Sequence, residues 1–87
     1  MKSQNKHSVE ITKLFKRRIR SLITEYRMVL LERVEELSSN AYIGKPLKGP
    51  YKGRRAVRVG RRYRLIYEIP EFCVVRLLDL RHGESAY

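Results

Sequence analysis

Apolar and polar residues alternate most regularly between residues 54 and 69, and this alternation predicts a β-hairpin. Residues 55–59 and 63–69 are rich in Val, Ile, Leu and Tyr, the composition of strands that lie on a half-buried sheet. Gly60, Arg61 and Arg62 separate these runs and are expected to form the loop. The unusual feature is that arginines occur inside the strands as well as in the loop.

The length of the loop determines which face of the hairpin the arginines occupy. A two-residue loop would oppose Arg58 to Tyr63 and mix charged and apolar side chains on both faces, whereas a three-residue loop opposes Arg58 to Arg64. The second register is predicted, because it gathers the apolar residues on one face: Val57, Val59, Tyr63, Leu65, Tyr67 and Ile69. The other face then carries Arg54, Ala56, Arg58, Arg64, Ile66 and Glu68. Opposed arginines repel each other, so an anion such as phosphate is expected to complete this site.

The N-terminal half of the chain is expected to supply the helices. Residues 13–39 contain neither Pro nor Gly, and their apolar residues recur at three- and four-residue spacing, which predicts amphipathic helix. Thr24 is a candidate N-cap, so a helical hairpin of residues 13–23 and 25–38 is expected, with one continuous helix as the alternative. Before the helices, Ser8–Thr12 alternates and is expected to form a short edge strand.

The remaining segments complete an α+β fold. Residues 39–53 hold three Gly and two Pro and are predicted to be a connection rather than an element. Pro70 and Glu71 mark a turn, after which residues 72–80 form an apolar strand inside the sheet. A three-residue turn there would place Arg76 opposite Ile66, on the arginine face. We therefore predict one domain over residues 1–87, with a short N-terminal strand and a two-helix hairpin packed on an antiparallel sheet.

The charge of the chain predicts an anionic partner. Twenty Lys and Arg against nine Asp and Glu give a formal charge of +11 on 87 residues. Nine of the basic residues, and no acidic one, lie between Lys45 and Arg64. Nucleic acid, an acidic protein and a membrane surface are the partners that such a balance favours. The membrane is disfavoured, because the basic residues cluster on predicted strands and not on a helix with an apolar face.

Composition also narrows the compartment and the chemistry. A single cysteine, Cys73, excludes an internal disulfide and the usual cysteine-based zinc sites, which fits a reducing cytoplasm, and no metal or cofactor is expected. The N-terminus has no apolar segment of the secretory type, and no run has the length of a membrane span, so we expect a cytoplasmic protein. Histidine is the side-chain type suited to acid–base work near neutral pH, and the chain has two, His7 and His82, of which His7 lies in a polar terminus.

Three segments resemble the RelE/ParE superfamily of toxins from type II toxin–antitoxin systems: KPLKG at residues 45–49, AVRVGRRYRLIYEI at 56–69 and VVRLLDLRHGESAY at 74–87. The resemblance implies the RelE-like fold, of the microbial ribonuclease type, and a basic cleft. It also implies a cognate acidic antitoxin, similar to RelB, in a hetero-oligomeric complex. The RelE branch of the family cleaves mRNA in the ribosomal A site, whereas the ParE branch poisons DNA gyrase.

The resemblance also implies a set of catalytic residues. Arg64 matches the arginine of the family's Tyr-Arg motif, Arg58 matches the basic residue before the Val-Gly turn, and Tyr87 matches the tail tyrosine. The basic position of the tail is shared between Arg81 and His82, because other members have His-Arg where this chain has His82 and Gly83. The basic residues expected to bind the RNA backbone are Lys45, Lys48, Lys52, Arg54, Arg55, Arg61 and Arg62.

Two functions are consistent with these residues. The first is a ribosome-dependent endoribonuclease that inhibits translation by cleaving mRNA, in which arginine forks stabilise the charge on the phosphorane. The alternative is a toxin homologue that only binds, either a gyrase poison or a RelE-like protein with weakened catalysis. The in-strand arginines and the tail favour the first function. Ala56, which stands at a position that is basic in the family, and the lack of an evident general base favour the second.

Overall fold

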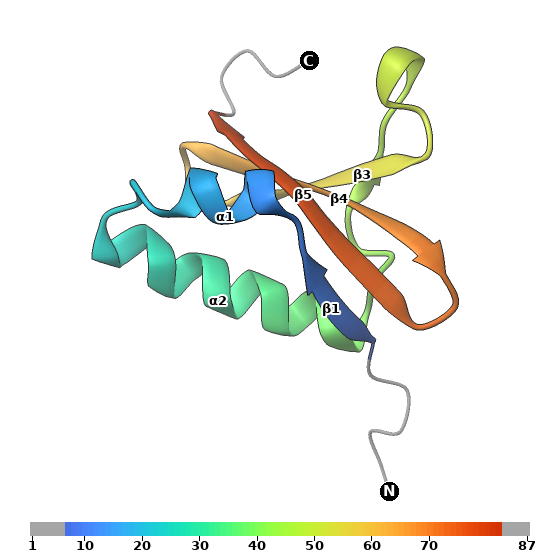
Figure 1. Ribbon diagram of the computed structural model, residues 1–87, viewed down its shortest axis with the longest axis horizontal. Coiled ribbons are helices and arrows are strands. Elements are labelled where there is room, and N and C mark those ends of the chain that lie inside the picture. The colour runs from blue at the N-terminus through green and yellow to red at the C-terminus, as the bar shows by residue number, and fades with distance from the viewer. Residues whose placement is uncertain (1–6, 83–87) are drawn as a thin grey trace, which may run out of the picture.

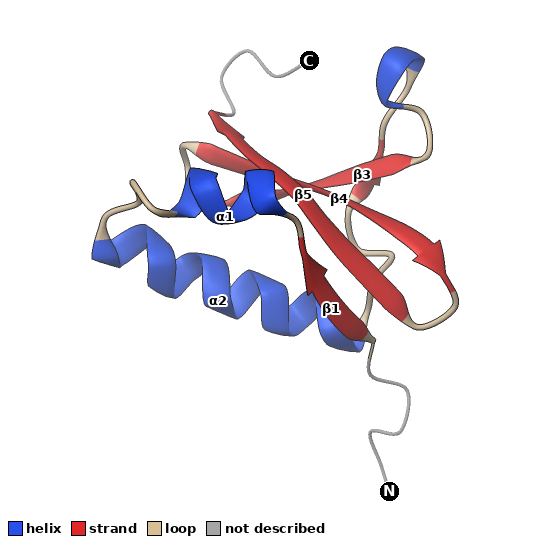
Figure 2. Cartoon of the chain, viewed as in Figure 1, coloured by secondary structure: helices blue, strands red, loops and turns tan. Residues whose placement is uncertain are grey.

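A five-stranded sheet with two helices against it forms the body of the protein in the computed structural model, which describes residues 7–82 (Figures 1 and 2). The elements, in chain order, are β1 (Ser8–Ile11), α1 (Lys13–Ile19), α2 (Thr24–Ser39), β2 (Lys45–Pro46), the 3₁₀ helix η1 (Gly49–Tyr51), β3 (Arg54–Val59), β4 (Tyr63–Glu71) and β5 (Val74–His82). The strand order across the sheet is β1-β5-β4-β3-β2. The predicted α+β class is confirmed, with the difference that β1 pairs parallel to β5, which makes the sheet mixed.

The two helices are separate, so the alternative of one continuous helix is wrong. Thr12 caps α1, because its Oγ1 accepts a hydrogen bond from the backbone N–H of Phe15 at 3.2 Å. The helix ends at Ile19, four residues before the predicted end, and the guanidinium of Arg27 binds the carbonyl oxygens of Ile19, Arg20 and Leu22. Thr24 is the first residue of α2 rather than its N-cap, which is Ile23. These carbonyl contacts satisfy backbone groups that a helix end would otherwise leave without partners.

The hairpin of β3 and β4 has the predicted register. Val59 pairs with Tyr63, Arg58 with Arg64 and Val57 with Leu65, and the apolar side of the sheet faces the helices. The core comprises Phe15, Leu22, Leu30, Leu37, Ala41, Val59, Leu65, Tyr67, Val75, Leu77 and Leu80. The buried Tyr67 hydroxyl donates a hydrogen bond to the Ala41 carbonyl at 2.6 Å and accepts one from the Gly44 N–H at 3.0 Å. Tyr67 thereby joins the sheet to the segment that leads into β2.

The second hairpin differs from its prediction. Strand β4 continues through Pro70 to Glu71, and the turn is formed by Phe72 and Cys73, whose φ is 64°. Register shifts on both sides of Glu68 place Arg76 opposite Glu68 instead of Ile66. Proline is tolerated at such irregular positions, because it removes a hydrogen bond that the irregularity already interrupts. The predicted connection over residues 39–53 is also not wholly irregular, since it contains β2 and η1.

Candidate phosphate-binding site

The face of the sheet away from the helices is organised in rungs, each made of residues that pair across neighbouring strands. The first rung runs Glu10, Arg76, Glu68, Arg54 across β1, β5, β4 and β3. Arg76 contacts the carboxylates of Glu10 at 2.9 Å and Glu68 at 3.0 Å, and Arg54 lies 4.0 Å from Glu68. The hydrogen bond to Glu10 is the main cause that raises the pKa of Arg76. We call these four residues the charge ladder; its signs alternate, so it is internally neutralised.

The second rung has an apolar centre. Ile66 of β4 pairs with Ala56 of β3 and with Asp79 of β5. Ile66 and Ala56 are buried although they lie on the face opposite the helices. The segment that carries η1 lies over this part of the sheet, and Tyr51 of η1 lines pockets that also contain Ile66 and Ala56. The predicted arginine face is therefore a small second apolar centre bordered by charge, not an evenly solvated surface.

The third rung consists of arginine alone. Arg64 of β4 pairs with Arg58 of β3 on one side and with Arg81 of β5 on the other. Paired side chains on one face of a sheet lie about 5 Å apart at Cβ, and like charges in such pairs repel. We call these three residues the arginine row. It is the part of the sheet best suited to an anion, because guanidinium groups bind phosphate oxygens with paired hydrogen bonds.

A β-bulge brings Arg81 into the arginine row. Tyr67 pairs with Leu77 and Ile66 pairs with Asp79, so Leu78 is an extra residue in β5. Without that residue, Leu80 instead of Arg81 would lie opposite Arg64. Bulges of this kind redirect side chains beside functional sites. The bulge also determines which face of the sheet His82 occupies.

Arg81 and His82 lie on opposite faces of the sheet. His82 pairs with Tyr63, and its ring stacks on the Tyr63 ring with centroids 4.9 Å apart. Tyr63 in turn meets Tyr26 of α2 edge to face at 5.0 Å. His82 therefore lies at the end of the helix-facing side, whereas Arg81 shares the face of Arg64. Tyr87, the other tail residue of the expected site, lies outside the described residues.

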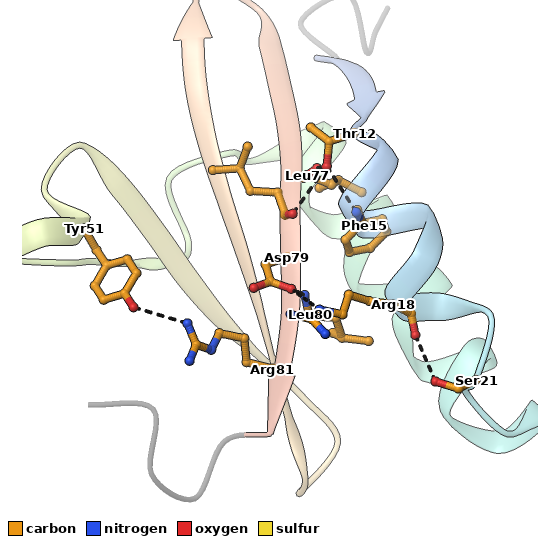
Figure 3. A network of polar contacts seen from close by, with 10 residues as sticks. Thr12, Phe15, Arg18, Ser21, Tyr51, Leu77, Asp79, Leu80 and Arg81 are labelled. Atoms are coloured by element: carbon orange, nitrogen blue, oxygen red, sulfur yellow. Dashed lines mark hydrogen bonds and ion pairs between the residues drawn. The ribbon is translucent and has the colours of Figure 1, made fainter.

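Tyr51 lies beside the arginine row and contacts it. Its hydroxyl accepts a hydrogen bond from Nη1 of Arg81 at 3.2 Å, and Figure 3 shows the Arg81 side chain extending from β5 toward Tyr51, away from α1. Tyr51 lines two pockets. One has a volume of about 640 Å³ and is lined by Lys45, Pro46, Leu47, Lys48, Tyr51, Ala56 and Arg64. The other has a volume of about 290 Å³ and is lined by Thr12, Leu14, Tyr51, Arg54, Ile66, Leu78, Asp79 and Arg81.

The basic residues expected to bind RNA backbone divide into three groups. Lys45, Lys48 and Lys52 are exposed on β2 and beside η1, near the larger pocket. Arg61 and Arg62 are exposed in the loop between β3 and β4.

The other two, Arg54 and Arg55, are neighbours in β3 but lie on opposite faces. Arg54 belongs to the charge ladder and lines the smaller pocket. Arg55 pairs with Tyr67, donates to the Gly44 carbonyl at 2.7 Å and lies over the Tyr42 ring at 5.0 Å. Of the two, only Arg54 shares a face with Ala56.

Sequence reasoning missed Tyr51 and Asp79. Asp79 Oδ1 accepts hydrogen bonds from Nε of Arg18 at 2.9 Å and from the backbone N–H of Leu80 at 2.8 Å. This contact fastens α1 to β5, and Figure 3 shows it beside the hydrogen bond from Thr12 to the Leu77 carbonyl. Asp79 also faces the smaller pocket. The adjacent apolar residues Leu77 and Leu78 interrupt the alternation of β5 and are the sequence signal that could have revealed the bulge.

No helix within residues 7–82 is long and apolar enough to cross a membrane. Residues 9–87 match the model of a family described as the ParE toxin of the type II toxin–antitoxin system parDE. A search of curated proteins found no match.

Solved structures with the same fold include toxin–antitoxin complexes. The complex RelBE2 from Mycobacterium tuberculosis contains a chain with 28% identity and a TM-score of 0.79, covering 90% of this chain and 99% of that one. A chain of the archaeal RelE–RelB complex from Pyrococcus horikoshii has 23% identity and a TM-score of 0.77, and the match covers 93% of this chain and 99% of that one. A chain of the intact RelBE complex of E. coli has 20% identity and a TM-score of 0.75, and the match covers 91% of this chain and 99% of that one.

Proposed function

Because this chain belongs to the ParE toxin family of type II toxin–antitoxin systems, we propose that it is the RelE-like kind of toxin, an endoribonuclease that cleaves mRNA on the ribosome. The observation that carries the proposal is the arginine row, in which Arg58, Arg64 and Arg81 lie side by side across three strands. Three guanidiniums side by side can donate several hydrogen bonds together to the oxygens of one phosphate.

The chemistry that the row supports is transesterification of RNA. The 2′-hydroxyl gives its proton to water as its oxygen attacks the adjacent phosphorus. The bond to the 5′-oxygen breaks, leaving a 2′,3′-cyclic phosphate, and the 5′-oxygen takes a proton from water. Negative charge builds on the phosphorane oxygens in between. Arg64, at the centre of the row, would stabilise that charge, with Arg58 on one side. Arg81 would bind the leaving 5′-oxygen as a hydrogen-bond donor, since a guanidinium stays protonated. Tyr87 remains a candidate for orienting the RNA on the strength of the sequence alone.

Between the two tail residues, the geometry favours Arg81. His82 lies on the helix-facing side, stacked on Tyr63, so its ring would have to leave that stack to reach a phosphate on the arginine row. We therefore assign the tail function to Arg81 and a packing function to His82.

One observation favours the alternative, a toxin that binds without cleaving. With His82 on the other face, the described residues bring no group that titrates near neutral pH to the arginine row. A gyrase poison or a catalytically weakened homologue would need only the basic surface. Pulse labelling of cells that produce the protein separates the two, because the nuclease arrests protein synthesis first and the gyrase poison arrests DNA synthesis first.

The partner that restrains the toxin would be an acidic antitoxin like the RelB chains of the similar complexes. The charge of +11 on this chain favours fast, salt-sensitive association with such a protein. Co-expression of a small acidic protein encoded beside this one should restore growth and co-purify with it. Growth arrest that no such protein relieves would contradict the assignment.

The decisive experiment is single-turnover cleavage of mRNA on programmed ribosomes at saturating ribosome. Losing a preorganised donor to a developing charge lowers rates by about 100- to 1,000-fold, so Arg64→Ala should lose cleavage to that extent. Arg64→Lys keeps the charge but not the forked guanidinium, so its cleavage rate should lie between those of wild type and Arg64→Ala. Lys48→Ala, an exposed lysine beside the same pocket, is the matched control and should change the rate little. Wild-type cleavage by a folded Arg64→Ala variant would remove the row from catalysis.

A further inference from the structure

The smaller pocket beside the arginine row has the features of a nucleobase site. Its walls are apolar on the sheet side, with Ile66 and Leu78, and Leu14 of α1 contributes from the other side. Tyr51 adds an aromatic residue to the lining. At about 290 Å³ the pocket lies at the small end of the range for ligand sites. Single-stranded RNA is commonly recognised by bases stacked on aromatic side chains, with the phosphates held by cations nearby.

The arginine row provides the second half of that arrangement. Arg81 belongs both to the row and to the lining of this pocket, and its Nη1 donates to the hydroxyl of Tyr51. A phosphate on the row therefore lies next to the mouth of the pocket, within the reach of the base of the same or the adjoining nucleotide. Continuity with a cationic row favours a nucleotide over a neutral apolar ligand.

Asp79 is the residue in this pocket that a simple phosphate site would not contain. A carboxylate repels phosphate, yet it is a good acceptor for the amino group of a base. The two hydrogen bonds that Asp79 accepts within residues 7–82 both go to Oδ1, from Arg18 and from the Leu80 N–H. Its second oxygen, Oδ2, is thus the atom that can accept a hydrogen bond from a base. Arg18, which donates to Oδ1, holds the carboxylate in this orientation.

We propose that the pocket formed by Tyr51, Ile66, Leu78 and Asp79 binds one nucleobase of the RNA, stacked on Tyr51, and selects bases with an exocyclic amino group through Asp79. This inference rests on the proposed function, because it takes the anion on the arginine row to be RNA. It adds a base preference, which the arginines alone cannot supply, since phosphate contacts carry no sequence information.

The test compares two pyrimidines that differ at the edge Asp79 would read. Cytosine carries an amino group where uracil carries a carbonyl oxygen. Fluorescence anisotropy is used to measure the binding of cytidine and uridine hexamers made with 2′-O-methyl sugars, which cannot be cleaved through the 2′-oxygen. Wild type should prefer the cytidine hexamer by roughly tenfold, the discrimination typical of one good base contact. Asp79→Asn should reduce the ratio to near one, because an amide can turn either its oxygen to cytosine or its amino group to uracil.

A matched variant separates base reading from the structural role of Asp79. Arg18→Gln breaks the same ion pair that fastens α1 to β5 but keeps the carboxylate. It should lower the melting temperature about as much as Asp79→Asn and yet keep the preference for cytidine. Tyr51→Leu should weaken both hexamers by roughly 5- to 100-fold, while Tyr51→Phe, which loses only the contact with Arg81, should bind nearly as wild type.

The outcomes distinguish this inference from the proposed function. A wild-type ratio near one, or a ratio that Asp79→Asn leaves unchanged, overturns the base pocket even if mRNA is cleaved on ribosomes. A clear cytidine preference that depends on Asp79, in a protein that cleaves nothing, supports the pocket and refutes the nuclease. Failure of the wild type to bind either hexamer at low salt overturns the base pocket, whereas the nuclease is decided by cleavage on programmed ribosomes.

Discussion

The Tyr67 hydroxyl joins two buried backbone groups to the sheet, and Tyr67→Phe tests what that link contributes. The side chain has no exposed surface, and its hydroxyl is a hydrogen-bonding partner of the Ala41 carbonyl and of the Gly44 N–H. Both of those residues are buried as well. Removing one oxygen atom leaves the ring packed in the core but takes away the partner of two backbone groups that water does not reach.

The size of the effect follows from those two groups. A buried donor or acceptor that loses its partner destabilises a protein by about 1–3 kcal/mol, and part of this is regained because the phenol no longer has to be desolvated. We therefore expect Tyr67→Phe to lower the free energy of unfolding by about 2–4 kcal/mol, which corresponds to a fall in Tm of about 10–25 °C for a domain of this size. A chain of 87 residues has roughly 4–13 kcal/mol in total, so the loss is a large share.

Tyr67 should also make the stability of the protein fall at alkaline pH. Burial raises the pKa of Tyr67 above its ordinary value of 10.0, against the smaller lowering effects of the Gly44 hydrogen bond and the Arg55 charge. The unfolded chain therefore loses this proton at lower pH than the folded protein does. The stability that the protonated Tyr67 hydroxyl contributes is fully present below about pH 10 and is lost as pH rises through the pKa of the folded protein. The difference in stability between wild type and Tyr67→Phe should narrow above that pH.

Urea or thermal unfolding followed by circular dichroism measures both effects. Tyr42→Phe is the matched control, because Tyr42 lies in the same segment, loses the same atom, and is 62% exposed. It should remain within about 0.5 kcal/mol of wild type. If Tyr67→Phe were as stable as Tyr42→Phe, the hydroxyl would not hold residues 41–44 to the sheet and the reasoning would be wrong.

Two further predictions concern the start of α1 and the basic surface. Thr12→Ala removes both the cap of α1 and the hydrogen bond to Leu77, so it should destabilise the protein by about 1–2 kcal/mol in the same unfolding assay, whereas the exposed Ser21→Ala should change it little. Binding of RNA hexamers should weaken steeply between low and moderate salt, because each phosphate that is neutralised releases counterions, and a flat titration would contradict docking led by phosphate.

The hairpin of β3 and β4 was predictable because each face repeats at every second residue over both strands. Burial of one face then permits a single register, and the opposition of Arg58 and Arg64 follows from that register. The helices were predictable as segments but not at their ends. The break after Ile19 depends on Arg27, which reaches back to the carbonyl groups of the previous turn, and no local pattern encodes that contact.

The third member of the arginine row could not be placed from the sequence. Its position depends on the bulge at Leu78, and without that one extra residue the same sequence would put Leu80 opposite Arg64. The bulge also decides which of Arg81 and His82 shares the face of Arg64, because adjacent residues of a strand lie on opposite faces, and this is why we propose Arg81 for the tail function. Tyr51 escaped prediction for a different reason. The Gly and Pro residues around it predicted a loop, and its contact with Arg81 joins positions 30 residues apart.

The arginines of this chain show why charge density alone does not locate the site. Arg76, Arg55 and Arg64 lie in the same sheet within two or three rungs of one another. Arg76 lies between two carboxylates, and Arg55 binds carbonyl oxygens on the helix-facing side. Arg64 is flanked across the strands by two more arginines. Neighbouring guanidiniums on one rung can donate together to the oxygens of a single anion, which one isolated cation cannot do. The composition of the rung, more than the total of +11, is therefore the ground on which we propose the arginine row as the phosphate site.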